Sequence, residues 1–313
     1  MSEVKQETTH LFCVPERTPL SEHKPLTPTD FKSDVKPDWC PSCGDFGVLT
    51  SLQKACSALG LQPKDILTVS GIGCSSNLPG FFKTYGMHTL HGRALPVATG
   101  AKLANPDLTV IITGGDGDGY GIGVGHFLHT VRRNLDLTYI VMDNQIYGLT
   151  TGQASATTEK GVKTKSTPEG VIETPVNPMA LALVSGATFV ARTFSGEPNH
   201  MAEVMAKAIQ HKGFSLVDCF SPCVTYNKIN TYTWFKQRVY KLEEKGHDPK
   251  NFSQAMTKAF EWGEHIPLGV FYENTEVPTY EDLDPTIQRF GPAVKQRLGL
   301  TEKEQAEILE GFL

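Results

Sequence analysis

The sequence has 313 residues, 39% of them hydrophobic and 20% charged, with a formal net charge of −5. This composition is that of a globular protein with one large or two modest domains, and the negative charge without any basic run argues against nucleic-acid binding. Because no stretch reaches the roughly 18 apolar residues of a membrane helix and the N-terminus lacks a secretion signal, we expect no membrane association and a cytoplasmic location.

Three regions follow one another along the chain. Residues 1–36 are rich in proline and charge and show little periodicity, so they predict an extended N-terminal arm. Residues 37–230 alternate between short apolar runs and candidate helices. Residues 231–313 are broken by Pro and Gly and end in an acidic stretch, which predicts a C-terminal extension that packs on the core or on a partner.

The fold is predicted from the middle region, residues 37–230. Its apolar, β-branched runs predict strands, and amphipathic segments between them, such as 121–133 and 201–211, predict helices. This alternation is typical of an α/β protein with a mainly parallel sheet flanked by helices on both faces. The predicted strands are 66–70, 108–114, 137–143, 187–192 and 214–220.

A glycine-rich stretch, GGDGDGYG, begins at Gly114, directly after one predicted strand. It fits neither G-x-G-x-x-G nor the P-loop pattern, so a nicotinamide or ordinary ATP site is not supported. Glycines at a strand end let backbone N–H groups form an anion nest, but Asp116 would repel a phosphate unless a cation lay between them. Mg²⁺ suits that position. The alternative is a plain glycine turn capped by Asp.

The next predicted strand ends at Asp143 and is followed by Asn144, 28 residues after Asp116. One helix and one strand separate the two residues, so they are expected at neighbouring strand ends, where they can share a metal ion.

Seven cysteines are spread through the chain, an odd number that favours metal binding or burial over a disulfide framework. Cys40 and Cys43 form a C-x-x-C, and Cys74 and Cys223 each follow a predicted strand. Thiolates from these loops could hold zinc or an iron–sulfur cluster, and spacing alone does not choose between them. Cys219 is the alternative to Cys223 as the fourth ligand, but it lies within a predicted strand. The remaining two cysteines, Cys13 and Cys56, belong to no motif.

Together the motifs WCPSCG, GIGCSS, HTLHGR, GDGD, DNQIYGLTTGQ and SPCVT, in this order, resemble the β subunits of 2-oxoacid:ferredoxin oxidoreductases, a family of thiamine-diphosphate enzymes. The resemblance covers about residues 37–230 and implies the diphosphate-binding fold of these enzymes. It implies that Mg²⁺ is held by Asp116, Asn144 and the carbonyl of Ile146. It also implies a [4Fe–4S] cluster on Cys40, Cys43, Cys74 and Cys223.

The resemblance implies further contacts to thiamine diphosphate, most of them through the backbone of glycine-rich loops. These are Ile72, Gly73, Cys74, Ser75, Gly115, Gly117, Asp118, Gly148 and Leu149. His91 and Arg93, in HTLHGR, are weak candidates for polarising the substrate. A structural role, capping helices or pairing buried polar groups, is equally expected for them.

The activity implied is oxidative decarboxylation of a 2-oxoacid with coenzyme A to an acyl-CoA and CO₂. Thiamine diphosphate acts as the electron sink, and electrons leave through the cluster to ferredoxin. GIGCSS favours 2-oxoglutarate over pyruvate, although Asn77 stands where some relatives have Lys or Arg.

The chain shows no domain for the aminopyrimidine, so a separate α subunit is expected to supply one, giving a heterooligomer that is active only when complete. Two alternatives remain: a non-redox thiamine-diphosphate decarboxylase or lyase subunit with structural zinc, and a non-enzymatic metal-binding scaffold.

Overall fold

The computed structural model describes residues 26–296, 299 and 301–311. Most of the predicted N-terminal arm, with Cys13, therefore lies outside the described residues. Of the arm, residues 26–36 include a short turn at Pro28–Phe31, and Phe31 is buried and stacked on Phe82 with ring centroids 5.7 Å apart. This end of the arm is thus part of the packed core.

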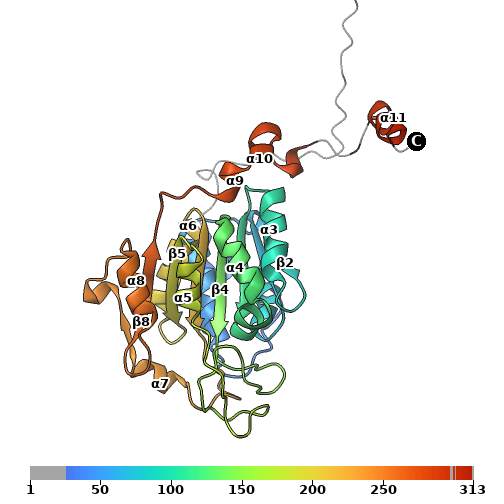
Figure 1. Cartoon of the computed structure of the whole chain (residues 1–313). Coiled ribbons are helices and arrows are strands. Elements are labelled where there is room, and N and C mark those ends of the chain that lie inside the picture. Colours follow the sequence, from blue (N-terminus) through green and yellow to red (C-terminus); the bar gives the residue numbers. More distant parts are fainter. Residues whose placement is uncertain (1–25, 297–298, 300, 312–313) are drawn as a thin grey trace, which may run out of the picture.

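Eight strands form one sheet in the order β2-β1-β3-β4-β6-β5-β8-β7 (Figure 1). The first six strands in this order, β2 through β5, are mutually parallel. β8 pairs antiparallel with β5, and β7 pairs parallel with β8. The predicted α/β fold with a mainly parallel sheet is confirmed. The bounds are β1 Ile66–Ser70, β2 Tyr85–His88, β3 Thr109–Gly115, β4 Leu137–Asp143, β5 Phe189–Phe194, β6 Phe214–Phe220, β7 Val239–Lys241 and β8 Ile266–Glu273.

Helices cover both faces of the sheet. Successive side chains of a strand point to opposite faces, so a strand whose residues are all buried must be covered on both sides. Along β4, Tyr139 and Val141 belong to one buried cluster and Ile140 and Met142 to the other. Each such buried side chain contributes about 1.5–3 kcal/mol of hydrophobic stabilisation. The first face carries α3 (Ala94–Ala104), α4 (Val124–Arg133), α5 (Pro178–Val184) and α8 (Phe252–Ala259), and the second carries α1 (Asp45–Ala58), α2 (Leu78–Phe81) and α6 (Pro198–Gln210).

The edge strand β2 differs from the others because all four of its residues are exposed. It carries no apolar run, which is why the sequence did not predict it. Tyr85 is 62% exposed and Met87 42% exposed. Within the described part of the chain, the sheet therefore ends on this side in an uncovered strand.

The residues after 230 complete the sheet with β7 and β8 and then return to its amino-terminal edge. There Asn134 donates from Nδ2 to the carbonyl of Pro278 at 3.1 Å, and the N–H of Tyr280 donates to the carbonyl of Asn134 at 3.2 Å. Besides α8, the helices of this region are α7 (Tyr232–Lys236), α9 (Tyr280–Leu283), α10 (Pro285–Phe290) and α11 (Glu302–Glu310).

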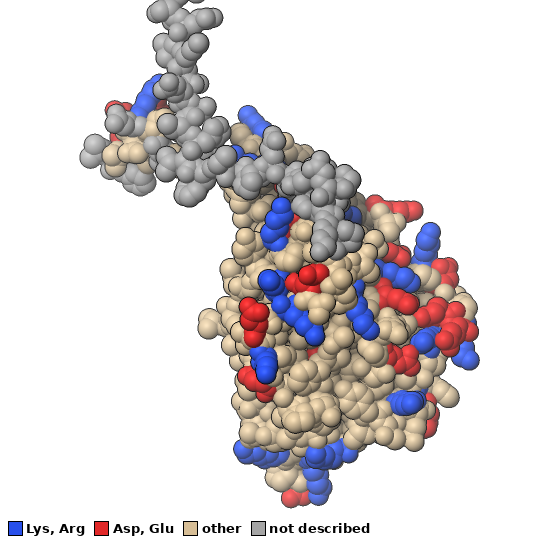
Figure 2. Space-filling view, turned by 180° about the vertical axis from the view of Figure 1, so that it is seen from behind, with Lys and Arg blue, Asp and Glu red and all other residues tan. Residues whose placement is uncertain are grey.

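Charged side chains of both signs are interspersed on the face shown in Figure 2. Neither sign forms a continuous surface there. Among the helices of the described residues, none combines the length and apolar character needed to cross a bilayer.

Candidate cofactor site

The glycine stretch after β3 forms a single wide helical turn, Gly117–Ile122, that leads into α4. Asp116, the residue directly before this turn, is 1% exposed, and its side chain makes no capping hydrogen bond to the turn. Gly117 has no room for a side chain, since a Cβ atom there would lie 2.2 Å from the ring of Tyr147. Tyr147 in turn donates its hydroxyl to the carbonyl of Gly117 at 3.0 Å. This contact fixes the start of the turn.

The end of β4 lies beside the end of β3, with Met142 opposite Gly115 in the parallel register. The predicted adjacency of these two strand ends is confirmed. Gln145 takes a left-handed φ of 58°, a strained conformation for a residue with a side chain, and Asn144 Oδ1 accepts the N–H of Ile146 at 3.0 Å. This tight turn keeps Asn144 and Ile146 close to the strand end.

Two hydroxyls from a later loop contact Asp116. Ser155 Oγ and Thr157 Oγ1 both donate to Asp116 Oδ2, the latter at 2.7 Å, and Thr157 Oγ1 also lies 2.9 Å from Asp143 Oδ1. A hydroxyl has a single hydrogen, so Thr157 cannot donate to both carboxylates at once. Neither hydroxyl was predicted from the sequence, because an ordinary Ser or Thr in a loop carries no motif.

Both carboxylates are costly to ionise in this environment. Burial raises the pKa of Asp116 to about 6, against the hydrogen bonds from Ser155 and Thr157. Burial, followed by the charges of Asp116 and Asp218, raises the pKa of Asp143. Within the described residues, no Lys, Arg or His side chain bonds Asp116. A divalent cation bound to oxygen ligands would supply the missing positive charge, so the residues fit Mg²⁺.

The Asp118 side chain contacts two neighbouring loops. Its Oδ1 accepts the N–H of Ile72 at 3.0 Å and of Gly92 at 2.8 Å, and lies 2.7 Å from His91 Nδ1. A contact from Asp118 to a diphosphate would therefore come from its backbone. His91 lies beside Tyr147, whereas Arg93 directly precedes α3 and donates to the adjacent carbonyl of Gly92 at 3.2 Å.

The cysteine loops are connected by hydrogen bonds to backbone carbonyls. Trp39 Nε1 donates to the carbonyl of Cys74 at 2.7 Å, and the N–H of Gly44 donates to the carbonyl of Pro222 at 3.2 Å. A Cβ atom on Gly148 would lie 3.6 Å from Cys223 Sγ and 3.7 Å from Cys74 Sγ. The loop after Asn144 thus meets sulfur atoms from two other loops.

The thiols also affect one another electrostatically. Burial, followed by the charge of Asp45 and those of Cys223 and Cys74, raises the pKa of Cys43 well above its ordinary value. Burial likewise raises the pKa of Cys74 to about 11, with smaller contributions from Asp45, Cys223 and Cys40. The four cysteines of the motifs are therefore close enough to affect one another electrostatically. An iron–sulfur cluster, which stabilises thiolates, fits this donor set.

The remaining described cysteines are separate from this group. Cys219 is fully buried in β6, where Thr193 donates to its sulfur at 3.1 Å, and Cys56 is fully buried in α1. No three His, Cys, Asp or Glu side chains of the described residues converge as ligands of a single metal ion. A four-iron cluster is larger than one ion and holds its ligands further apart.

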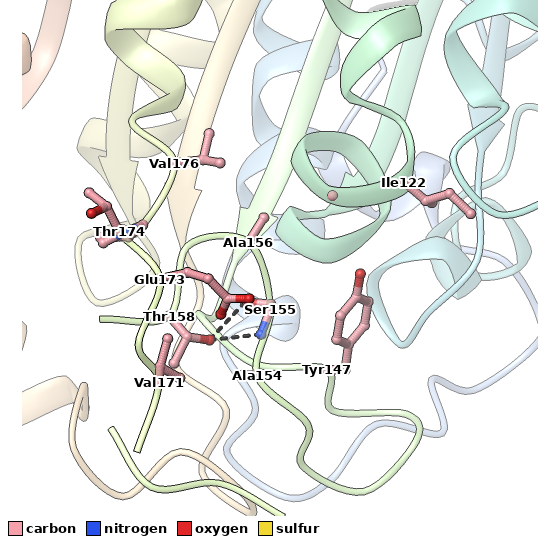
Figure 3. A pocket seen from close by; sticks show the side chains of 12 residues that line it. Ile122, Tyr147, Ala154, Ser155, Ala156, Thr158, Val171, Glu173, Thr174 and Val176 are labelled. Atoms are coloured by element: carbon pink, nitrogen blue, oxygen red, sulfur yellow. Dashed lines mark hydrogen bonds between the residues drawn. The ribbon is translucent and has the colours of Figure 1, made fainter. Parts of the chain in front are cut away.

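A cavity of about 410 Å³ opens beside Asp116. Figure 3 shows Tyr147 and Ile122 on one side, opposite Thr158, Val171, Glu173 and Thr174, with Ser155 between them. Since Ser155 also bonds Asp116, the cavity adjoins the candidate metal site.

Comparisons with known proteins agree with this arrangement. Residues 71–219 match the family described as thiamine pyrophosphate enzyme, C-terminal TPP binding domain, and residues 223–289 match the family described as the C terminal of the pyruvate ferredoxin oxidoreductase beta subunit. The fold and site therefore define a subunit of a thiamine-diphosphate enzyme.

Individual relatives show which kind of thiamine-diphosphate enzyme the chain resembles. The chain is 52% identical over 256 residues to the 2-oxoacid:ferredoxin oxidoreductase subunit beta of Saccharolobus solfataricus, covering 78% of this chain and 84% of the relative. It is 45% identical over 204 residues to the 2-oxoglutarate oxidoreductase subunit KorB of Mycobacterium tuberculosis, covering 65% of this chain and 55% of that one.

A solved structure is similar over almost the whole chain. It is a 2-oxoglutarate:ferredoxin oxidoreductase from Magnetococcus marinus with 2-oxoglutarate, coenzyme A and succinyl-CoA bound, with 41% identity and a TM-score of 0.84. The match covers 92% of this chain and 97% of that one. The chain belongs to the β subunits of the 2-oxoacid:ferredoxin oxidoreductases, and a β subunit implies an α partner.

Proposed function

We propose that this chain binds thiamine diphosphate through Mg²⁺ and serves the oxidative decarboxylation of a 2-oxoacid. The observation that carries the proposal is the position of Gly148. It follows the candidate metal ligands Asn144 and Ile146 and lies against the sulfur atoms of Cys74 and Cys223. The proposed cofactor and the proposed electron acceptor would therefore be neighbours.

In this proposal Asp116, Asn144 and the carbonyl of Ile146 hold Mg²⁺ against the diphosphate. Glycine-rich loops at the strand ends bring backbone N–H groups to the phosphate oxygens. When bound, thiamine diphosphate supplies the electron sink for decarboxylation. The backbone and side-chain contacts proposed for the cofactor are Ile72, Gly73, Cys74, Ser75, Gly115, Gly117, Asp118, Gly148 and Leu149.

Cys40, Cys43, Cys74 and Cys223 are the proposed ligands of a [4Fe–4S] cluster. The cluster would supply one-electron transfer when bound. Cys40 is the exposed member of the set, so this side of the site faces the surface from which electrons would pass to ferredoxin. His91 is held by Asp118 next to the site and is proposed, with Arg93, to orient the substrate.

The substrate we favour is 2-oxoglutarate, with pyruvate next, and coenzyme A as acyl acceptor. The 2-oxoglutarate enzymes among the relatives and the ligands of the Magnetococcus structure support this preference. Asn77, which is half-buried beside Cys74, lacks the positive charge that would pair with a distal carboxylate. Pyruvate therefore remains the competing substrate.

The α partner is proposed to carry the pyrimidine-binding domain, so that activity requires both subunits. In this division residues 37–230 form the cofactor-binding unit and residues 231–313 extend it. The experiment is to purify the chain anaerobically with its α partner and measure coenzyme-A-dependent dye reduction with a panel of 2-oxoacids. Highest kcat/KM with 2-oxoglutarate is expected.

Metal analysis of the same preparation tests the cluster. About four irons and four sulfides per β chain, with visible absorption that bleaches on reduction, are expected for one [4Fe–4S] cluster. Zinc without iron, and decarboxylation without dye reduction, would instead identify a non-redox thiamine enzyme with structural zinc. Turnover by the β chain alone would contradict the proposed division between subunits.

A further inference from the structure

The segment 154–158 crosses the carboxyl ends of β3 and β4 and is fixed at several points. The chain reverses before it, where the N–H of Tyr147 donates to the carbonyl of Gln153 at 2.9 Å. Thr158 Oγ1 accepts the N–H of Ser155 at 2.8 Å and donates to the carbonyl of Gln145 at 2.7 Å. The N–H of Val176 donates to the carbonyl of Ala156 at 2.8 Å. The segment is thus attached to the turn that carries Asn144.

Thr157 occupies the centre of this segment and is 3% exposed. Its hydroxyl lies between two carboxylates, 2.7 Å from Asp116 Oδ2 and 2.9 Å from Asp143 Oδ1. The hydroxyl of Ser155 contacts the same oxygen of Asp116. Because both contacts fall on Oδ2, they fix the rotation of the Asp116 carboxylate and direct Oδ1 elsewhere.

We propose that Thr157, assisted by Ser155, is a positioning residue that sets the geometry of the metal-binding carboxylate of Asp116. This inference rests on the proposed assignment of Asp116 as a Mg²⁺ ligand. Mg²⁺ demands nearly ideal octahedral coordination, whereas Ca²⁺ accepts irregular geometry. Loss of the Thr157 hydroxyl therefore weakens Mg²⁺ binding more than Ca²⁺ binding.

The test uses the complex of this chain with its α partner and three variants of Thr157 and Ser155. Thr157→Val removes the hydroxyl at nearly constant shape, Thr157→Ser keeps it, and Ser155→Ala removes the assisting hydroxyl. Thiamine diphosphate binding is followed by calorimetry as Mg²⁺ or Ca²⁺ is varied. Groups that orient metal ligands typically contribute about 10–100-fold to metal affinity.

Thr157→Val is expected to raise the apparent Kd for Mg²⁺ by about tenfold or more, and that for Ca²⁺ by clearly less. Thr157→Ser is expected to stay close to the native protein, and Ser155→Ala to fall between them. The matched control is Thr138→Val, which removes a buried hydroxyl of β4 that donates to the carbonyl of Ala208 rather than to a carboxylate. It is expected to leave both affinities unchanged.

Asp116→Ala separates failure of this inference from failure of the assignment on which it rests. If Asp116→Ala binds thiamine diphosphate with unaltered Mg²⁺ dependence, the assignment of Asp116 is wrong. If Asp116→Ala loses that dependence while Thr157→Val keeps native affinity for both ions, only the positioning role is wrong. An equal loss of Mg²⁺ and Ca²⁺ affinity in Thr157→Val, matched by lower thermal stability, would identify a purely structural role and overturn the proposal.

Discussion

Trp39 donates its indole N–H to the backbone carbonyl of Cys74 across 2.7 Å. The ring also packs edge-on against Phe46 and Phe81, with centroids 5.3 Å and 5.0 Å away. Because Trp39 directly precedes Cys40, this one side chain connects the C-x-x-C loop to the loop of Cys74. The relative placement of the proposed cluster ligands depends on it.

Replacing Trp39 by Phe retains an aromatic ring but removes the donor to Cys74. The Cys74 carbonyl still accepts the N–H of Asn77 at 3.2 Å, so the loss is that of one hydrogen bond, about 0.5–1.5 kcal/mol, and the two loops become less firmly connected. We expect lower iron content and faster loss of visible absorption in air, with the far-ultraviolet circular dichroism unchanged. Trp262→Phe is the control, since Trp262 packs on Phe220 and Trp234 and, among the described residues, makes no hydrogen bond to the cysteine loops. Equal cluster lifetimes in both variants would contradict this role.

Substitution of Cys223 and Cys219 distinguishes a ligand from a core thiol. A serine hydroxyl is a poor replacement for a soft thiolate ligand, so Cys223→Ser is expected to lose the cluster. Cys219→Ser is expected to retain it, at some cost in stability, because Cys219 contacts Thr193 inside the sheet. Iron and sulfide analysis of both proteins checks the prediction, and the opposite ranking would reassign the ligand.

Gly117→Ala is expected to weaken thiamine diphosphate binding by about tenfold or more. The added Cβ would lie 2.2 Å from the Tyr147 ring, so the ring or the turn must move, and the Tyr147 bond to the Gly117 carbonyl is lost. Gly100→Ala is the control. It lies in α3, where an added Cβ would meet no heavy atom within 4 Å, and it should stabilise the helix by up to about 1 kcal/mol. Calorimetry showing equal affinity in both variants would exclude a role for the Gly117 turn in binding.

The chain stripped of metal and cofactor should lose stability as the pH rises from about 4 to about 6. Burial raises the pKa values of Asp45 and Asp116 to about 6, above the 3.8 of a free carboxyl. In that window the folded state binds more protons than the unfolded state, so the free energy of unfolding falls with rising pH. Each group contributes about 3 kcal/mol over the full window.

Urea unfolding between pH 4 and pH 7 measures this effect. Asp45→Asn is expected to flatten the dependence, because it removes one of the two carboxyls whose pKa burial raises to about 6. Asp34→Asn changes the same charge at an exposed position and should leave the slope as it is. At pH 7, addition of Mg²⁺ and thiamine diphosphate should restore stability. A native-like slope in Asp45→Asn would show that Asp45 is not responsible.

The strands that the sequence predicts with correct bounds are β1, β4 and β6. Parallel strands buried on both faces must be apolar at nearly every position, so each one appears in the sequence as a nearly continuous apolar run. β8 lacks such a run because Pro267 and Gly269 interrupt it, and β7 has only three residues. Tertiary pairing, rather than local pattern, creates both.

Some residues of the candidate site could likewise be predicted from the sequence, whereas others could not. Asp116 and Asn144 follow from their positions after neighbouring strands, since the topology of a parallel sheet brings such ends together. Ser155 and Thr157 do not follow, because their contacts depend on the reversal at Tyr147 and on a loop path with no periodicity. The need for glycine at 117 likewise depends on the Tyr147 ring, which arrives from another loop.

The uncovered strand β2 has a consequence for handling the chain by itself. An edge strand with free backbone donors and acceptors is a template for pairing with another chain, and natural proteins normally protect such edges with charge, proline or a covering element. β2 instead presents Tyr85 and Met87. Chains produced without a partner are therefore prone to associate edge to edge and precipitate, so coexpression with the α subunit should raise the soluble yield of the β subunit.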